Sequence, residues 1–188
     1  MAHYATIGDT LEQTVARYPD TDAIVYPRKD QRWTYREFDD RVNRLANALI
    51  ELGVEKGDRV ATVLHNGSEM ALSVYACAKI GAVFTPLNFR LPADEIEYIV
   101  NDAEADMVVY ESDTKTAVEN ARPELNSVEE FVFIDDDAPE ETRSFYGLLE
   151  SGSPESPEVV VDENDIYAFI YTSGTTGRPK GVVHEHRD

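Results

Sequence analysis

Residues 166–181 read Ile166-Tyr167-Ala168-Phe169-Ile170-Tyr171-Thr172-Ser173-Gly174-Thr175-Thr176-Gly177-Arg178-Pro179-Lys180-Gly181. The first five are apolar, which predicts a buried strand that leads into a loop at the edge of a sheet. The three glycines allow sharp turns that bring backbone N–H groups close to a ligand. The hydroxyl groups and the charges of Arg178 and Lys180 add donors and cations, and no carboxylate interrupts the run. This combination predicts a loop that binds a polyphosphate.

The loop differs from the common P-loop, G-x-x-x-x-G-K-[ST]. Here Arg178 and Pro179 separate Gly177 from Lys180, and neither Ser nor Thr follows the lysine. The next residues, 181–184, are typical of a second strand and not of the start of a helix. We therefore expect the phosphates to be held by a mobile loop between two strands, without a helix dipole behind it. Such a loop should become ordered on ATP, so that ATP slows protease cleavage near Arg178.

Upstream of the loop, helix-like and strand-like segments alternate. A first helix is expected over residues 7–18, with Asp9 or Thr10 near its start, and a hairpin with strands at 23–26 and 32–35 follows. Further along we expect strands at 59–64, 82–85 and 105–110 and helices at 69–80 and 94–101. Alternation at intervals of about a dozen or more residues is the pattern of βαβ units, so we predict an α/β fold with a mostly parallel sheet.

A long helix precedes the first of these sheet strands. Thr34 is its predicted N-cap, with Glu37 three residues later as the partner in a capping box. Gly53 is expected to end this helix, as Gly81 is expected to end the helix at 69–80. The buried face of the long helix is predicted to comprise Phe38, Val42, Leu45, Ala46, Leu49 and Ile50.

Residues 112–165 give weaker signals. A strand is expected at 131–134, a short helix at 144–149 and a loop at 151–157. The aspartate run at 135–137 invites a metal site, but three consecutive aspartates project in different directions and no further ligands are spaced around them. A solvated acidic turn is the alternative that we favour.

Charge is distributed unevenly along the chain. It carries 37 Asp and Glu against 17 Lys and Arg, for a formal net charge of −20. Residues 101–165 hold 20 acidic and 3 basic residues, whereas residues 166–188 hold 2 and 3, so the loop lies in a part that is not acidic. The acidic excess disfavours a nucleic-acid partner. Five lysines against twelve arginines among so many carboxylates suggest a protein of a salt-loving organism.

Length and composition set further limits. A chain of 188 residues can bury one good-sized core or form part of a larger domain, and its 42% hydrophobic content favours a globular fold. No apolar run approaches the roughly 20 residues that cross a bilayer, and residues 1–4 lack a signal segment. The single cysteine, Cys77, lies in an apolar helical stretch and is expected to be a buried structural thiol. A cytoplasmic protein is the simplest expectation.

Residues 171–182 resemble the phosphate loop of the AMP-forming, adenylate-forming enzymes, a family that includes acyl-CoA synthetases, nonribosomal adenylation domains and firefly luciferase. His186 and Arg187 match a His-Arg pair that follows this loop in the family. The similarity extends to residues 53–60, 78–88 and 91–96 and covers most of residues 20–187. A plain surface linker is the alternative for such a run, but linkers rarely carry an ordered strand on each side.

The resemblance implies the fold of the large N-terminal domain of an acyl-CoA synthetase. It also implies that a carboxylate attacks the α-phosphate of ATP, that pyrophosphate leaves, and that the acyl group passes from AMP to the thiol of coenzyme A. ATP, Mg²⁺ and coenzyme A are the implied cofactors and cosubstrates, with a fatty or similar apolar carboxylate as substrate. The residues that match the phosphate-binding motif are Thr172, Ser173, Gly174, Thr175, Thr176, Gly177 and Lys180.

Several of these residues have a plainer interpretation. Lys180 could be a solvated lysine without a ligand, and Arg178, just before a proline, could simply face water. His184 and His186 alternate onto one strand face and invite a metal or acid–base role, but two histidines without a third ligand fit a packed or surface pair better. We therefore predict no metal site. His186 also matches a family position near the acyl pocket, and we retain it as a candidate there.

The resemblance further implies elements that residues 1–188 do not contain: an adenine and magnesium motif, a ribose-binding aspartate, a hinge and a catalytic lysine. We therefore expect residues 1–188 to be the first part of an AMP-binding domain in a protein of roughly 500 residues or more, inactive alone. The alternatives are an adenylation domain that loads a carrier protein, a luciferase-like oxygenase, or a non-catalytic nucleotide-binding or interaction module. The choice of carboxylic acid and the oligomeric state stay open.

Overall fold

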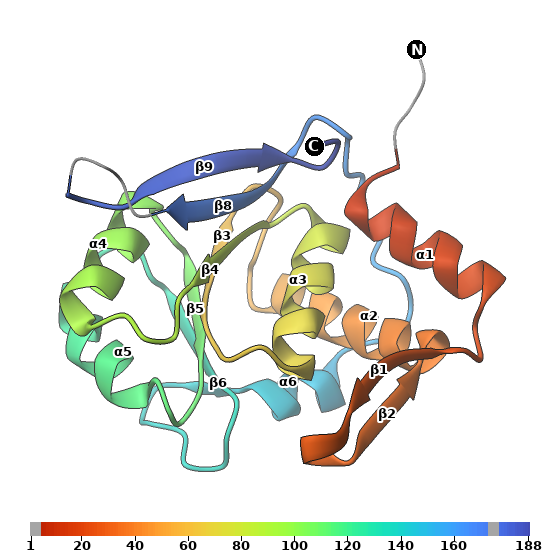
Figure 1. The fold of residues 1–188 in the computed structure, drawn as a ribbon, viewed down its shortest axis with the longest axis horizontal. Helices are drawn as coiled ribbons and strands as arrows, with labels where there is room; N and C mark the ends of the chain where they lie inside the picture. The colour runs from red at the N-terminus through yellow and green to blue at the C-terminus, as the bar shows by residue number, and fades with distance from the viewer. Residues whose placement is uncertain (1–4, 173–176) are drawn as a thin grey trace.

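The computed structural model describes residues 5–172 and 177–188 and has a seven-stranded sheet at its centre (Figure 1). The strand order is β7-β6-β5-β3-β4-β8-β9. Neighbouring strands pair in parallel, except that β8 and β9 are antiparallel. The predicted α/β fold with a mostly parallel sheet is confirmed. The strands are β3 (Arg59–Val63), β4 (Val83–Leu87), β5 (Met107–Tyr110), β6 (Glu130–Phe133), β7 (Arg143–Ser144), β8 (Ile166–Thr172) and β9 (Lys180–Glu185).

Helices cover both faces of the sheet, as parallel crossovers require. On one face α2 contacts α3 and α6, and α1 packs against α2 and α3, whereas α4 and α5 contact each other on the opposite face. In the described part of the chain, no helix combines the length and apolar character needed to cross a membrane. The helices are α1 (Ile7–Arg17), α2 (Tyr35–Glu51), α3 (Ser68–Ile80), α4 (Ala93–Asp102), α5 (Lys115–Ala121) and α6 (Phe145–Ser151).

Alternate residues of the central strands belong to two separate cores. In β3, Val60 lies in the core formed with α2 and α3, and Ala61 and Val63 lie in the core formed with α4 and α5. In β5, Val109 and Tyr110 divide in the same way. Because both faces of these strands are buried, their sequences are continuous apolar runs instead of alternating patterns.

Local signals in the sequence place most of the helix ends. Thr34 and Glu37 form the predicted capping box at the start of α2. Gly81 ends α3 with a φ of +70°, a left-handed conformation that favours glycine. Helix α1 begins earlier than Asp9 or Thr10, because Thr6 is its N-cap and Asp9 is the capping-box partner.

The predicted hairpin near the N-terminus forms a small sheet of its own. Its antiparallel strands are β1 (Asp22–Tyr26) and β2 (Gln31–Thr34), joined by the 3₁₀ turn η1 (Pro27–Lys29). Figure 1 shows this hairpin beside α2 and away from the main sheet.

Some expectations are wrong. Ile50, assigned to the buried face of α2, is 38% exposed, although Leu49 beside it is buried, so Ile50 lies outside the buried stripe of the helix. Helix α5, the short turn η2 (Arg122–Glu124) and strand β7 were not expected. Helix α5 has only seven residues, of which Val118 and Ala121 are buried, and no side chain caps its start, so its sequence signal is weak.

Candidate functional site

The predicted phosphate loop joins β8 to β9, and the strand expected on each side of it is confirmed. The burial predicted for residues 166–170 is wrong, because β8 lies near the edge of the sheet: only Ala168 is fully buried, and Ile166 is 39% exposed. The two strands pair from Ile166 with Glu185 to Thr172 with Lys180, so Thr172 and Lys180 are cross-strand partners at the mouth of the loop. The register between β4 and β8 joins Phe84 to Ala168. We call β8, β9 and the loop between them the phosphate hairpin. It forms one edge of the main sheet (Figure 1), and Gly177, Arg178 and Pro179 lie beside α4.

Three of the seven residues that match the phosphate-binding motif are described by the structure. Thr172 and Lys180 are exposed. Gly177 has a φ of +102° and open space where a Cβ would lie, so its backbone conformation, not crowding, favours glycine. The other four, Ser173, Gly174, Thr175 and Thr176, lie outside the described residues.

Lys180 differs from every other lysine of the chain. The other four donate to carboxylate or carbonyl oxygens, in the pairs Lys29–Glu69 (2.8 Å), Lys56–Asp165 (2.5 Å), Lys79–Asp39 (2.8 Å) and Lys115–Asp137 (2.7 Å). The side chain of Lys180 has no hydrogen bond or ion pair with any residue that the structure describes. In a chain with 37 carboxylates, an exposed ammonium without a carboxylate partner is available to an anion from solution.

Arg178 and Pro179 are attached to α4 through Tyr98. The guanidinium carbon of Arg178 lies 5.0 Å from the centroid of the Tyr98 ring, within cation–π range. The Tyr98 hydroxyl donates to the carbonyl oxygen of Pro179 at 3.2 Å. The side chain of Arg178 is therefore turned toward α4, so the two cations of the loop have different surroundings.

Tyr171 attaches the other strand of the hairpin to the same helix. Its hydroxyl donates to Oδ2 of Asp102 at 2.7 Å. Burial and this bond to a carboxylate raise the pKa of Tyr171 well above its usual range, so the hydroxyl is a neutral donor. Its ring packs over Gly181, where a Cβ would come within 3.1 Å of it. Gly181 lies within β9, as the strand predicted at 181–184 implies, and there it makes room for Tyr171 instead of serving a turn.

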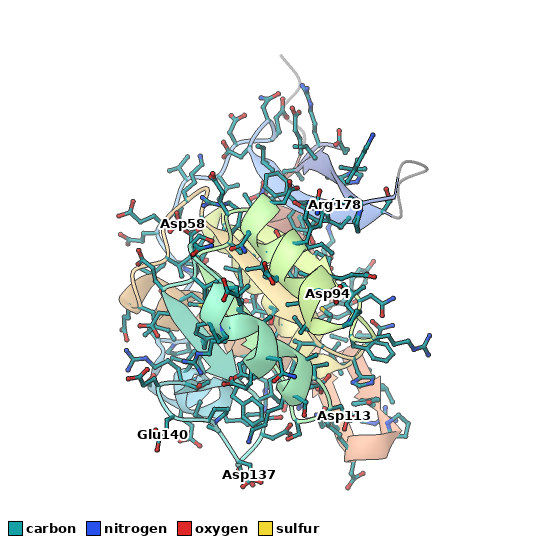
Figure 2. All side chains as sticks on the ribbon, turned by 90° about the vertical axis from the view of Figure 1, so that its left-hand side faces the viewer. Asp58, Asp94, Asp113, Asp137, Glu140 and Arg178 are labelled. Atoms are coloured by element: carbon teal, nitrogen blue, oxygen red, sulfur yellow. The ribbon has the colours of Figure 1, made fainter. Side chains whose placement is uncertain are left out.

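A groove of about 860 Å³ lies between α4 and the base of the loop. Its lining includes the carboxylates of Asp94, Glu95, Glu97 and Asp102, with Arg178 as the cation among them. Figure 2 shows Asp94 on α4 and Arg178 on the hairpin near the end of this helix. So many carboxylates would repel a polyphosphate, which leaves the exposed mouth of the loop as the candidate anion site.

The structure places the two histidines in different environments. Strand β9 ends at Glu185, and His186 lies just beyond it, only 5% exposed. Its Nδ1 accepts a hydrogen bond from the backbone N–H of Ile7 at 3.3 Å. His184 is partly exposed and lies 3.7 Å from Asp188. The described residues contain no group of three or more His, Cys, Asp or Glu side chains suited to a metal ion.

The His186 ring is held neutral by its surroundings. Burial lowers its pKa, opposed by the carboxylates of Asp165 and Asp9. Because Nδ1 accepts a hydrogen bond, the proton of the neutral ring belongs on Nε2, which is buried without a partner among the described atoms. The ring centroid is 5.3 Å from that of Tyr167. A role beside the acyl chain stays a prediction.

Two other features have structural roles, as expected. Cys77 is fully buried, and burial raises the pKa of its thiol to about 12, so it is not a thiolate nucleophile. The acidic run at 135–137 forms part of a bend in which Asp135 accepts from the backbone N–H of Ser112 at 2.8 Å. Lys115 donates to the backbone carbonyl of Asp137 in the same bend.

The sequence interpretation overlooked Tyr98 and Asp102. They are four residues apart on α4, so both lie on one face of that helix. The one available signal was this spacing of polar groups on a helix whose apolar positions are Ile96, Ile99 and Val100. Nothing in the local sequence links them to a loop about 80 residues downstream.

Comparison with known proteins agrees with this geometry. A family model described as AMP-binding enzyme matches residues 11–188. The long-chain-fatty-acid–CoA ligase FadD13 of Mycobacterium tuberculosis is 36% identical over 183 residues, which are 96% of this chain and 35% of that protein. The chain thus spans about a third of the length of that relative.

Two solved structures have the same fold. The N-terminal domain of FACL13 from Mycobacterium tuberculosis superposes with a TM-score of 0.90 at 35% identity, over 97% of this chain and 45% of that one. The anthranilate CoA ligase AuaEII, in complex with anthranoyl-AMP, gives a TM-score of 0.93 at 28% identity, over 100% of this chain and 36% of that one. The chain therefore belongs to the AMP-binding enzyme family and has the fold found in the N-terminal domains of acyl-CoA synthetases.

Proposed function

We propose that the complete protein is an AMP-forming acid–thiol ligase and that residues 1–188 supply its phosphate-binding hairpin. One observation carries the proposal: Lys180 stands exposed at the mouth of the loop, without a partner among the described residues, in a chain whose other lysines are all paired. Its cross-strand partner, Thr172, adds a hydroxyl donor at the same place.

In the proposed reaction, the carboxylate oxygen of the acid attacks the α-phosphorus of ATP, and pyrophosphate leaves with the bonding electrons. The ammonium of Lys180 and the hydroxyl of Thr172 bind the β- and γ-phosphates, together with Ser173, Gly174, Thr175, Thr176 and Gly177 of the loop. Negative charge grows on the departing pyrophosphate, so fixed cations and donors at these oxygens lower the barrier. The thiol of coenzyme A then attacks the acyl carbon, and AMP leaves.

We propose Mg²⁺ only as an ion bound to the phosphates of ATP. The described residues include no cluster of carboxylates or histidines arranged to hold it, so no residue of this chain is assigned to it. Bound there, the ion would neutralise charge on the phosphate oxygens.

For the substrate we propose a fatty or similar apolar carboxylate. The support is the name of a relative, a long-chain-fatty-acid–CoA ligase. The anthranilate CoA ligase of similar fold makes aromatic acids the next class to test. His186 is kept as a candidate beside the acyl chain, on its family match. The catalytic lysine, the hinge and the ribose-binding aspartate would come from sequence outside residues 1–188, so we propose that these residues alone do not catalyse.

The test is carboxylate-dependent exchange of labelled pyrophosphate into ATP by the complete gene product, in high salt, with short, long and aromatic acids. Exchange with any acid supports adenylation, and the best acid identifies the substrate class. Adding coenzyme A or a phosphopantetheinyl carrier protein afterwards distinguishes a CoA ligase from a domain that loads a carrier. ATP binding without exchange for any acid would favour a non-catalytic nucleotide-binding module.

A further inference from the structure

Helix α4 contacts β8 and the residue just before β9, through two side chains that no sequence motif singles out. Tyr98 donates to the carbonyl oxygen of Pro179 at 3.2 Å, and Asp102 accepts from the hydroxyl of Tyr171 at 2.7 Å. Tyr98 and Asp102 are four residues apart, so they lie on one face of the helix. We call these two residues the α4 pair.

The contacts of the α4 pair flank the mouth of the loop. Tyr171 immediately precedes Thr172 at the end of β8, and Pro179 immediately precedes Lys180 at the start of β9. Thr172 and Lys180 are the cross-strand partners that open the loop. One helix face therefore holds the residue next to each of the two groups proposed to bind phosphate.

The α4 pair also separates the roles of the two cations. The Tyr98 ring holds the guanidinium of Arg178 over α4, beside the carboxylates that line the groove. The ammonium of Lys180, two residues further along, has no such contact with a described residue. Arg178 thus offsets the negative charge of α4 near the loop, and Lys180 is left for the ligand.

The position of Asp102 is informative, because it is the last residue of α4. A carboxylate at a helix C-terminus is unfavourable next to the partial negative charge of that end. Asp102 therefore does not help the helix, and its described hydrogen bond is the one from Tyr171. The same tyrosine packs over Gly181, where a Cβ would crowd its ring at 3.1 Å.

We propose that Tyr98 and Asp102 are positioning residues that set the distance between the two strands at the mouth of the loop and so prepare it for the phosphates of ATP. This inference rests on the proposed function of the loop. Binding that requires no rearrangement loses less affinity to ordering, so a loop held in advance should show a lower KM for ATP.

The experiment uses the complete gene product and measures pyrophosphate exchange with varied ATP and varied carboxylate. Asp102→Ala, Tyr171→Phe and Tyr98→Phe should each raise the KM for ATP by about tenfold, the scale for loss of one such hydrogen bond, while the KM for the carboxylate stays unchanged. Asp102→Asn keeps an oxygen acceptor for Tyr171, so its KM for ATP should stay close to that of the parent. The double variant Asp102→Ala with Tyr171→Phe should be no worse than either single variant, because both remove the same bond.

Tyr146→Phe is the matched control. It also removes a hydrogen bond from a tyrosine to a carboxylate, here the one to Glu69 at 2.6 Å, but at a site away from the hairpin. The KM for ATP should not change. An equal rise in this control, or no rise in the Asp102 and Tyr171 variants, would overturn the proposal.

Tryptic cleavage after Lys180, without ATP, separates the inference from the proposed function. Loosened strands should be cut several times faster in Asp102→Ala and Tyr171→Phe than in the parent or the control. If the parent protein shows no exchange with any acid, the proposed function fails, and the cleavage rates alone decide whether the α4 pair holds the loop. Equal cleavage rates in that case would overturn it.

Discussion

The two ends of the molecule differ in whether their charged side chains have partners. Figure 2 labels Asp113 and Asp137 at one end and Arg178 near the other. At the first end, carboxylates have partners: Glu69 accepts from Lys29, and Asp135 accepts from a backbone N–H. At the hairpin end, Lys180 is a cation that no described residue neutralises. In a chain of net charge −20, where cations are scarce, an unpaired one marks a binding site better than the size of a groove does.

The largest effect is expected from removing the unpaired cation, Lys180, which tests whether the hairpin end binds an anion. Lys180→Gln should lower pyrophosphate exchange by about 100-fold or more, because a fixed charge on the phosphate oxygens acts where negative charge develops. Exchange rates at saturating acid measure the loss. Lys115→Gln is the matched control, since it removes a lysine already engaged by Asp137. If both variants lose less than about threefold, the range of an ordinary surface charge, Lys180 is a solvated lysine.

The next test concerns the paired end. Glu69 is buried, and its carboxylate accepts from Lys29 at 2.8 Å, Tyr146 at 2.6 Å and Ser68 at 3.0 Å. Glu69→Gln leaves Lys29 without its counter-charge and should lower the free energy of unfolding by about 2 kcal/mol. Urea titration measures this. Exchange kinetics should be unaffected, so a raised KM for ATP would contradict the separation of the two ends.

The pH dependence of stability provides a second readout for Glu69. Burial raises its pKa, but the hydrogen bonds from Lys29 and Tyr146 outweigh this effect, and the net pKa is lowered. A lowered pKa contributes stability that is present above the unfolded value of about 4.3 and is lost as the pH falls through the folded value. Glu69→Gln should therefore flatten the loss of stability in acid. An unchanged slope would show that other carboxylates determine it.

Salt should act mainly on the acidic regions. Residues 101–165 carry 20 acidic and 3 basic residues, and their mutual repulsion is screened as the Debye length falls from about 10 Å at 0.1 M to about 3 Å at 1 M salt. We expect the melting temperature to rise by about 5 °C over this range. Replacing the three aspartates at 135–137 by asparagine should reduce that rise. Cooperative melting and unchanged near-UV circular dichroism in low salt would contradict the proposed adaptation to salt.

The features that the sequence predicted depend on neighbouring residues. The capping box of Thr34 and Glu37, the glycine stop at Gly81 and the strands around the phosphate loop each arise within a few residues, and all are confirmed. Helix α5 is not predicted, because a segment of seven residues with two buried positions is too short to show a helical periodicity of apolar residues.

The features that the sequence did not predict depend on contacts between distant segments. Tyr98 and Pro179 are 81 residues apart, and Asp102 and Tyr171 are 69 apart, so no local pattern joins them. The sequence predicts a strand over 181–184, which includes Gly181, but it does not predict that this glycine makes room for the ring of Tyr171 on the neighbouring strand. The seven candidate loop residues came from a motif, and that motif contains no information about the helix that holds the loop.

The smallest expected effect concerns His186. Unlike the paired carboxylates and the exposed Lys180, it is a titratable group that is buried in its neutral form. Burial lowers its pKa, opposed by the carboxylates of Asp165 and Asp9, and Lys56 adds to the lowering. The folded ring therefore resists protonation more than the unfolded one. Its contribution to stability is present above the unfolded pKa of about 6.5 and is lost as the pH falls below that value.

His186→Asn keeps an oxygen acceptor for the backbone N–H of Ile7 but does not titrate. At pH 8 the variant and the parent should differ by a constant packing cost. As the pH falls from about 6.5 to 5 the parent should lose a fraction of a kcal/mol relative to the variant, measured by urea titration at each pH. A constant difference across that range would show that His186 is free to protonate in the fold, and a second cation would then lie just past β9, at the opposite end of that strand from Lys180.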